Sequence, residues 1–376
     1  MNKIFIEDCC EILDSMRVPI TASKREIGEY PYYGANGIQD YVADYIFDDE
    51  LVLLAEDGGN FGSKERPIAY RVSGKCWVNN HAHVLKPKVG LDIDYLCYSL
   101  MFYKVDGLIN GATRKKLTQA AMRKMQIPFR SIKEQIHIVN ELNRIIKIKE
   151  KRQEELKLLD NLIKARFVEM FGDLANPECL WNKSKLIEVC VDKDDIKCGP
   201  FGTQLSKDEY MESGIAVWEI PQINTAFKSR PVHFITSEKA EQLKAYTIIP
   251  GDIAMSRKGN VGKCAIFPEN YPAGIIHSDV LRIRINSQLV NPTFMMCQLH
   301  FSGAITRQIE LVSSGAIMAG VNVTKLKQIY VHIPPIELQS QFADFVRAID
   351  KSKVAVQKAL EKTQLLFDSL MQQYFG

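Results

Sequence analysis

Residues 131–171 read SIKEQIHIVNELNRIIKIKEKRQEELKLLDNLIKARFVEMF, and residues 336–375 read IELQSQFADFVRAIDKSKVAVQKALEKTQLLFDSLMQQYF. Neither stretch contains glycine or proline, and each begins shortly after a proline. Because glycine and proline both disfavour the interior of a helix, this pattern predicts two uninterrupted α-helices. At a rise of about 1.5 Å per residue, each helix would be about 60 Å long, which is more than a globular domain of this size needs.

Apolar residues recur along both helices at alternating spacings of three and four, which is typical of a coiled-coil seam. In each helix seven of the ten positions in this series are apolar. Lys149, Gln153 and Asp160 interrupt the series in the first helix. The predicted seam residues are Val139, Leu142, Ile146, Leu156, Ile163, Phe167, Met170, Phe342, Phe345, Ile349, Val356, Leu366 and Leu370.

The segments around the helices repeat one another, and four short motifs recur in the same order. Phe5-Ile6-Glu7 with Cys9 recurs as Leu186-Ile187-Glu188 with Cys190, Gly59-Asn60-Phe61-Gly62 as Gly259-Asn260-Val261-Gly262, His81-Ala82-His83-Val84-Leu85-Lys86 as His277-Ser278-Asp279-Val280-Leu281-Arg282, and Ile127-Pro128 with Gln135 as Ile333-Pro334 with Gln341. Four matches in order indicate a duplicated unit of about 190 residues.

The repeat predicts a mixed α/β fold with four parts. Short β-prone stretches such as Tyr45–Leu54 alternate with turns before each helix. The expected parts are a first domain over 1–130, a helix over 131–171, a linker and second domain over 172–335, and a second helix over 336–376. If an approximate two-fold axis relates the halves, the helices pair antiparallel between the two domains. The alternative is a long helical hairpin that dimerises with a second copy of itself.

The composition places the chain among globular proteins. It has 376 residues, 46% hydrophobic and 25% charged, with a net charge of +3. No apolar run approaches the length of a membrane span, and the first residues lack the apolar core of a signal peptide, so we expect a cytoplasmic protein without membrane contact. The nine cysteines form no C-x-x-C pair, which favours reduced, mostly buried thiols.

Several stretches of the sequence, distributed over essentially the whole chain, resemble the DNA-specificity subunits of type I restriction–modification enzymes. The matching stretches are Tyr30-Pro31-Tyr32-Tyr33-Gly34-Ala35-Asn36-Gly37-Ile38, Asp57-Gly58-Gly59-Asn60, Phe171-Gly172-Asp173 with Asn176-Pro177 and Trp181, Gly199-Pro200-Phe201-Gly202, Pro250-Gly251-Asp252-Ile253, and Ile333-Pro334-Pro335 with Gln341. The first half departs from the family's pattern in having Pro128-Phe129 where two prolines are usual.

The resemblance implies two target-recognition domains, each contacting one half of a split, asymmetric sequence in double-stranded DNA, with the helices as a spacer. It also implies two methyltransferase subunits as partners, joined by restriction and translocase subunits. The basic cluster Arg144, Lys147, Lys149, Lys151 and Arg152 on the first helix is a candidate docking site for the methyltransferase, although pairing with nearby glutamates is its simpler explanation.

Each domain needs cations for phosphates and planar polar groups for base edges. Candidates lie in basic loops, after glycine-rich turns and at strand starts, although such groups are often only solvated surface. The candidate DNA-contacting residues are Lys64, Arg66, Asn79, Asn80, His81, His83, Arg114, Lys115, Lys116, Gln204, Lys207, Arg257, Lys258, Asn260, Lys263, His277 and Arg307.

No motif supports catalysis by the chain alone. Asn291-Pro292-Thr293-Phe294 lacks the second proline of a methyltransferase tetrapeptide, and Asp195-Ile196-Lys197 is a weak nuclease match in a loop of mixed charge. Cys76, His81 and His83 could be drawn as a metal site, but no fourth ligand is placed by sequence. We therefore expect no catalytic residue, cofactor or metal. The alternatives are a protein–protein adaptor of the same architecture and, less favoured, a methyltransferase or nuclease.

Overall fold

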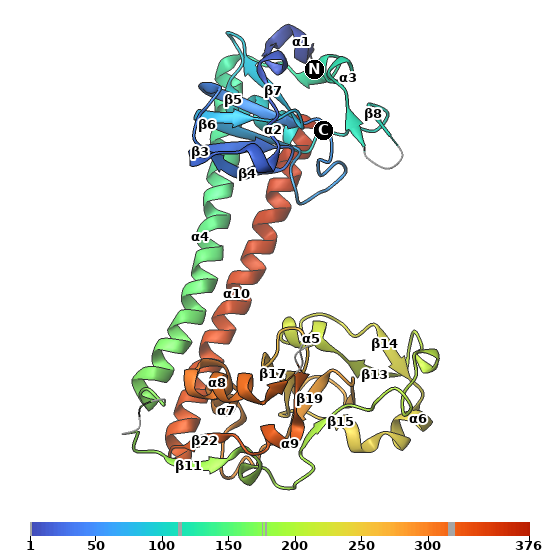
Figure 1. Ribbon diagram of the computed structural model, residues 1–376, viewed down its shortest axis with the longest axis vertical. Helices are drawn as coiled ribbons and strands as arrows, with labels where there is room; N and C mark the ends of the chain where they lie inside the picture. Colours follow the sequence, from blue (N-terminus) through green and yellow to red (C-terminus); the bar gives the residue numbers. More distant parts are fainter. Residues whose placement is uncertain (1, 112–114, 175, 177–178, 315–319) are drawn as a thin grey trace. The chain divides into compact units, whose positions relative to one another are not determined.

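The computed structural model describes residues 2–111, 115–174, 176, 179–314 and 320–376 (Figure 1). It divides into unit 1, residues 1–153 with 357–376, and unit 2, residues 154–356. Helices α4 (Ile132–Phe171) and α10 (Ile336–Phe375) each contribute to both units. We call residues 2–131 of unit 1 head 1, and residues 172–335 of unit 2 head 2.

Head 1 is built on a six-stranded sheet with the strand order β2-β7-β5-β6-β3-β4. These strands are β2 (Cys10–Ile12), β3 (Ile27–Gly34), β4 (Gly37–Val42), β5 (Phe47–Ala55), β6 (Ala69–Val78) and β7 (Ala82–Pro87). Strand β5 pairs antiparallel with both β6 and β7, and β3 joins β6 in parallel. The apolar run Leu51–Ala55 is fully buried because the central strand is covered on both faces.

Short helices and strands complete head 1. Helix α2 packs against β5 and β6. The strand that opens the chain pairs antiparallel with the strand that precedes α4, and β8 pairs with β9. The bounds are β1 (Lys3–Phe5), α1 (Ile6–Cys9), α2 (Ile93–Met101), β8 (Ile109–Asn110), β9 (Lys116–Leu117), α3 (Gln119–Arg123) and β10 (Gln126–Pro128).

Head 2 contains two four-stranded sheets, ordered β12-β19-β16-β17 and β14-β13-β18-β15. Their strands are β12 (Ile196–Cys198), β13 (Ile215–Trp218), β14 (His233–Ile235), β15 (Thr247–Ile248), β16 (Ile253–Ser256), β17 (Cys264–Ile266), β18 (Gly274–Ile276) and β19 (Val280–Ile283). The other elements are β11 (Asn182–Lys185), α5 (Ile220–Asn224), α6 (Ser237–Gln242), α7 (Pro292–Phe301), α8 (Gly303–Val312), β20 (Ser313–Ser314), β21 (Gly320–Val321), α9 (Val323–Leu326) and β22 (Tyr330–Ile333).

The two heads share one topology, which confirms the predicted internal repeat. The order β12-β19-β16-β17 of head 2 corresponds to β2-β7-β5-β6 of head 1. Helix α2 follows this sheet in head 1, and α7 and α8 follow it in head 2. In each head a small hairpin and a short helix come next, and the last strand pairs with the first before the long helix starts. The mixed α/β class with two long helices is likewise confirmed.

A buried glutamine joins the first turn of each long helix to the preceding head. Gln135 accepts a hydrogen bond from Asp92 N–H at 2.8 Å and donates to the carbonyl oxygens of Gly90 and Arg130. In α10 the matching residue is Gln339, which accepts from Asn291 N–H at 2.8 Å. Sequence comparison paired Gln135 with Gln341, and this pairing was wrong, because Gln341 is exposed.

The long helices run antiparallel where they pack within each unit. In unit 1, Tyr374 Oη donates to Glu141 at 2.6 Å, and Lys149 donates to Gln364. In unit 2, Lys353 lies 2.5 Å from Asp160. Residue numbers therefore rise along α4 as they fall along α10. These polar groups lie along the apolar seam, where they favour one register of the helix pair over others.

The buried face of α4 includes most of its predicted seam. Val139, Leu142, Ile163 and Phe167 are buried, whereas Ile146, Leu156 and Met170 are half-buried.

The buried face of α10 agrees with its predicted seam at alternate positions. At the positions between them, the buried residue is the one that follows the predicted residue. Phe342 and Val356 are buried, and Ile349 and Leu370 are half-buried, as the spacing requires. The intervening positions are displaced: Val346 is buried, and Phe345 lies half-buried beside Arg166. Leu366 was wrongly assigned to the seam, because it is 51% exposed while Phe367 is 5% exposed. The run Leu365-Leu366-Phe367 fits either phase of the apolar spacing, so the sequence pattern does not separate them.

This correction predicts different costs for two neighbouring truncations. Phe367→Ala should lower the free energy of unfolding by about 3–5 kcal/mol, because it leaves a cavity in the apolar cluster of unit 1. Leu366→Ala is the matched control and should change it by about 0.5 kcal/mol or less, as at other exposed positions. Urea unfolding followed by circular dichroism measures both values. Equal losses for the two variants would show that the seam has been misplaced.

Candidate nucleic-acid interface

The candidate site of head 1 includes the turn that follows β5. Asn36 Nδ2 donates to the carbonyl oxygen of Gly58 at 3.0 Å, which ties this turn to the β3–β4 connection. A Cβ atom at Gly59 would lie 2.4 Å from the Cβ of Ala55, so a larger residue would displace the turn. Lys64 and Arg66 follow on the same connection and are exposed.

The β8–β9 hairpin is held against this turn. Leu117 N–H donates to the carbonyl oxygen of Glu56 at 2.7 Å, and Asp57 forms a β-bridge with Lys116. The ammonium group of Lys116 lies 3.0 Å from Glu56 Oε1 and remains about half exposed. Lys115 is also exposed, whereas Arg114, the third predicted cation of this loop, lies outside the described residues.

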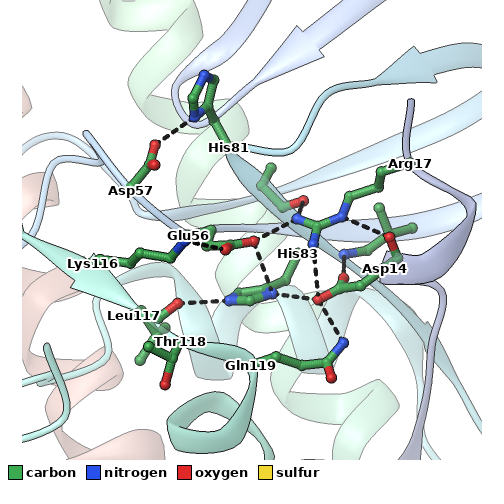
Figure 2. Close-up of polar contacts among 12 residues, drawn as sticks. Asp14, Arg17, Glu56, Asp57, His81, His83, Lys116, Leu117, Thr118 and Gln119 are labelled. Carbon is green, nitrogen blue, oxygen red and sulfur yellow. Dashed lines mark hydrogen bonds and ion pairs between the residues drawn. The ribbon is translucent and has the colours of Figure 1, made fainter. Parts of the chain in front are cut away.

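The two histidines at the start of β7 differ in environment (Figure 2). His81 is about one-third exposed, and its Nδ1 lies 2.6 Å from Asp57. His83 is fully buried, with Nδ1 2.6 Å from Asp14 Oδ2 and Nε2 2.9 Å from the carbonyl oxygen of Leu117. The prediction that His83 contacts DNA directly therefore needs correction, because no part of this side chain is accessible.

The neighbouring asparagines also differ. Asn79 is buried, donates to Gln39 and accepts a hydrogen bond from His81 N–H, so its amide shapes the β6–β7 turn and is not available to a base edge. Asn80, at the tip of the same turn, is exposed and stays a candidate contact.

The carboxylates around His83 form a network of ion pairs. Asp14, Glu56 and His83 lie close enough together to hold a metal ion. However, Arg17 Nη1 lies 2.6 Å from Glu56, and Lys116 lies on its other oxygen, so cations of the protein already balance both carboxylates. Burial by itself would raise the pKa of Asp14, but the hydrogen bond and charge of His83 outweigh it and lower that pKa. The network is fully explained without a metal.

Cys76 does not join His81 and His83 in a site. It is buried in a separate apolar cluster, and burial raises the pKa of its thiol to about 12. A thiol with so high a pKa stays protonated near neutral pH and is a poor metal ligand. All nine cysteines are free thiols, and seven are buried.

In head 2 the turn after β16 carries cations where head 1 carries acids. Arg257 and Lys258 occupy the positions of Glu56 and Asp57, because Val321 N–H donates to the carbonyl oxygen of Arg257 at 3.1 Å, just as Leu117 does to Glu56. The guanidinium of Arg257 lies 5.3 Å from the ring centroid of Phe201.

Acidic and aromatic residues surround these cations. Lys258 Nζ lies 2.8 Å from Asp279, which follows His277 at the start of β19. The loop containing Phe201 lies against this strand, since a Cβ at Gly199 would lie 2.3 Å from the carbonyl oxygen of His277. Gln204 is exposed on the same loop and accepts a hydrogen bond from Tyr246 at 2.9 Å. The structure thus brings together predicted residues from three separate segments of head 2.

The remaining head 2 candidates are more scattered. Lys263, directly before β17, donates to the carbonyl oxygen of Asn224 at the end of α5, at 3.0 Å. Asn260 lies at the tip of the β16–β17 turn and Lys207 in the loop before β13, and both are exposed. Arg307 lies on α8 and is exposed.

Several residues at these sites were missed by sequence reasoning. Asp14, Arg17 and Glu56 converge on His83 from separate segments, and no local motif marks them. A usable signal did exist for the hairpins: Gly111-Ala112 recurs as Gly315-Ala316, at the same distance before Leu117 and Val321. That comparison would also have shown three basic residues, 114–116, in head 1 against Met318, Ala319 and Gly320 in head 2.

The arrangement offers cations, amides and imidazoles on exposed or half-buried turns that connect the strands of the sheets. Such groups suit phosphate oxygens and base edges. Among the described residues, no helix is long and apolar enough to cross a membrane.

Comparison with known proteins places these features in a family. The family model for the type I restriction modification DNA specificity domain matches residues 1–158 and 180–365. A protein of Haemophilus influenzae named as a type I restriction enzyme specificity subunit is 27% identical over 378 residues, covering 98% of this chain and 92% of that protein. The type I restriction enzyme EcoprrI specificity subunit of Escherichia coli is 26% identical over 119 residues, covering 32% of this chain and 28% of that protein.

Two solved structures share the fold along the whole chain. One is the S subunit of a type I restriction–modification system from M. genitalium, with a TM-score of 0.58 at 14% identity, covering 100% of this chain and 96% of that chain. The other comes from work on complex assembly and conformational transition of the type I system, with a TM-score of 0.59 at 14% identity, covering 100% of this chain and 97% of that chain. Since the family model spans most of the sequence, the chain belongs to the DNA specificity subunits of type I restriction–modification systems, which are non-catalytic.

Proposed function

We propose that the chain selects DNA for a type I restriction–modification complex by contacting one half of a split target with each head. One observation carries this proposal: equivalent turns in the two heads present different charged groups. The turn after β5 in head 1 carries Glu56 and Asp57, whereas the equivalent turn in head 2 carries Arg257 and Lys258. Two unlike surfaces on one repeated fold suit a target whose halves differ in sequence.

The contact surface that we propose consists of the candidates whose side chains are exposed or half-buried. His83 and Asn79 are excluded by burial and act as supports. In head 1 the surface comprises Lys64, Arg66, Asn80, His81, Lys115 and Lys116, with Arg114 by sequence, and in head 2 it comprises Gln204, Lys207, Arg257, Lys258, Asn260, Lys263, His277 and Arg307. We further propose that the domains run over 1–130 and 172–335, and that the protein works in the cytoplasm.

The helices are proposed to set the distance between the half-sites. Each is 40 residues long and contains no break, so it can transmit a length. This assignment gives the paired helices a measurable role that a self-dimerising hairpin or an adaptor without DNA contact would not have.

An exposed face of α4 is the proposed docking site for a methyltransferase subunit. Two such subunits would bind the chain, and the restriction subunits would join them. Leu158 is 59% exposed and Leu162 is 46% exposed, one turn apart, and they line a shallow hollow with Glu155 and Ala165. Exposed leucines clustered on one face of a helix are typical of a surface that a partner covers.

The first prediction concerns the basic hairpin of head 1. Neutral substitution of Arg114, Lys115 and Lys116 by glutamine should weaken DNA binding. The slope of log K against log salt should become shallower by about 0.9 for each phosphate that is no longer neutralised. Fluorescence anisotropy with a duplex at several salt concentrations measures this slope. The matched control removes the same charge from α10 through Lys351, Lys358 and Lys362, which are exposed. A slope that falls equally in both variants would contradict the assignment of the hairpin.

The second prediction concerns the spacer. Inserting one heptad into the middle of each long helix keeps the seam in phase and adds about 10 Å. The gap between the half-sites should grow by about three base pairs. Methylome sequencing of cells that carry the variant with its partner subunits measures this gap. A heptad inserted in one helix alone mismatches the seam and should abolish methylation. A gap that is unchanged after the double insertion would mean that the helices do not measure the target.

The third prediction concerns the partner. Leu158→Lys with Leu162→Lys should disrupt co-purification with the methyltransferase, because two charges cannot be buried unpaired at an interface. DNA binding by the isolated chain should not change. Leu365→Lys is the control on α10, where the side chain is 68% exposed. Intact co-purification of the double variant would rule out this face.

A further inference from the structure

A buried histidine fixes the backbone of the basic hairpin in head 1. We propose that His83, in its doubly protonated form, positions the β8–β9 hairpin for DNA contact, so that this hairpin loosens as the pH rises while the corresponding hairpin of head 2 does not. This inference rests on the proposed function, since it assumes that Lys115 and Lys116 contact DNA.

The hydrogen-bond geometry requires two N–H groups on the ring. Nδ1 lies 2.6 Å from Asp14 Oδ2, and Nε2 lies 2.9 Å from the carbonyl oxygen of Leu117. Both of these oxygens are acceptors, so both ring nitrogens must donate. A neutral imidazole carries one N–H, whereas the imidazolium carries two. Loss of a proton therefore breaks one of the two hydrogen bonds.

Two carboxylates face the ring of His83. Asp14 from the segment before β3 and Glu56 after β5, at 3.6 Å, face it with negative charge. Arg17 contacts both carboxylates, and Lys116 contacts Glu56. Gln119 donates to Asp14 at 3.0 Å. Figure 2 shows the ring enclosed by these groups. The lowered pKa of Asp14, held down against burial by His83, agrees with an ion pair at this position.

The carbonyl group that accepts from His83 belongs to Leu117, the residue directly after Lys115 and Lys116. Leu117 is fully buried, its N–H donates to Glu56, and its carbonyl oxygen accepts from His83. Both backbone groups of one residue therefore anchor β9. Without the hydrogen bond from Nε2, the carbonyl would be buried with no partner, which favours undocking of the hairpin.

Head 2 holds the corresponding carbonyl with a group that does not titrate near neutral pH. Arg257 Nε donates to the carbonyl oxygen of Val321 at 3.3 Å, while Val321 N–H donates to the carbonyl oxygen of Arg257 at 3.1 Å. The anchored residue occupies the place of Leu117, directly before the short helix that ends the hairpin. Because a guanidinium stays charged throughout this range, head 2 serves as an internal control.

Hydrogen–deuterium exchange on the full chain tests the anchor without DNA. Peptides covering β9 and α3 in head 1, and β21 and α9 in head 2, are followed from pH 5.5 to 9, with rates corrected for the intrinsic pH dependence of exchange. We expect protection of the head 1 peptides to fall about tenfold across a single transition, the effect of one hydrogen bond to a charged group. Protection of the head 2 peptides should stay constant.

Three variants separate positioning from simple structural support. Asp14→Asn removes the counter-charge but keeps the shape of the side chain, so the transition should move to lower pH. His83→Gln removes the titrating group and should give a profile without a transition. Arg257→Gln should lower protection in head 2 at every pH without creating a transition. A purely structural role for Asp14 would change the level of protection but not the pH of its midpoint.

Anisotropy with a 40-base-pair duplex at constant ionic strength adds the DNA arm. The wild-type affinity should fall severalfold between pH 6 and pH 8.5, and His83→Gln should reduce this dependence to the part contributed by His81 and His277, which belong to the proposed contact surface. Head 1 protection that is constant across the pH range, or a midpoint that Asp14→Asn leaves in place, would overturn the inference whatever the DNA affinity. Protection that changes while affinity does not would keep the His83 anchor but overturn the DNA role of the hairpin.

Discussion

Both heads depend on the burial of side chains from both long helices. In unit 1 the ring of Phe375, at the end of the chain, lies 5.2 Å from Tyr95 in α2 of head 1. In unit 2 the ring of Phe167 packs on Phe294 of head 2 and on Phe342 of α10. The largest apolar cluster of each unit therefore closes only when α4 and α10 are both in place. Since burial of a large aromatic ring contributes several kcal/mol, neither head is expected to be independent of the helix pair.

This constraint explains why the joints between heads and helices are polar and buried. Gln135 and Gln339 each occupy the first turn of a long helix and hydrogen-bond to the backbone that starts α2 or α7. A buried amide must meet its partners in one orientation, whereas apolar contacts tolerate sliding. The glutamines thus fix the direction in which each helix leaves its head, and the aromatic clusters then hold it there.

The sequence was sufficient for the features that depend on repetition and spacing. The helices, the repeated domains and the α/β class follow from the absence of proline and glycine, from motif order and from alternating strands. The details failed where two nearby residues satisfy the same pattern. Leu366 and Phe367 are both apolar, and only packing against α4 decides which one is buried. Gln339 and Gln341 lie in the same turn of α10, and only the position of Asn291 selects the first.

The candidate site was predictable in its exposed part and not in its support. Basic loops and glycine turns are local in sequence, so the lysines of the hairpin could be identified directly. Asp14 and Glu56 reach His83 from segments far apart in the chain, and their roles exist only after folding. For this reason His83 was grouped with His81, two residues away, although His83 is fully buried and His81 is about one-third exposed.

The repeated fold demands a donor at one backbone carbonyl in each head but does not specify which one. The carbonyl oxygen of Leu117 accepts a hydrogen bond from His83 in β7, and that of Val321 accepts one from Arg257 in the turn after β16. Either choice satisfies the hairpin, because the carbonyl needs only one N–H. The choice has consequences elsewhere, since a histidine inside the sheet leaves the turn free for acids, whereas an arginine in the turn adds a cation to the exposed surface. A duplicated scaffold can in this way keep its geometry while the charge that each head presents diverges.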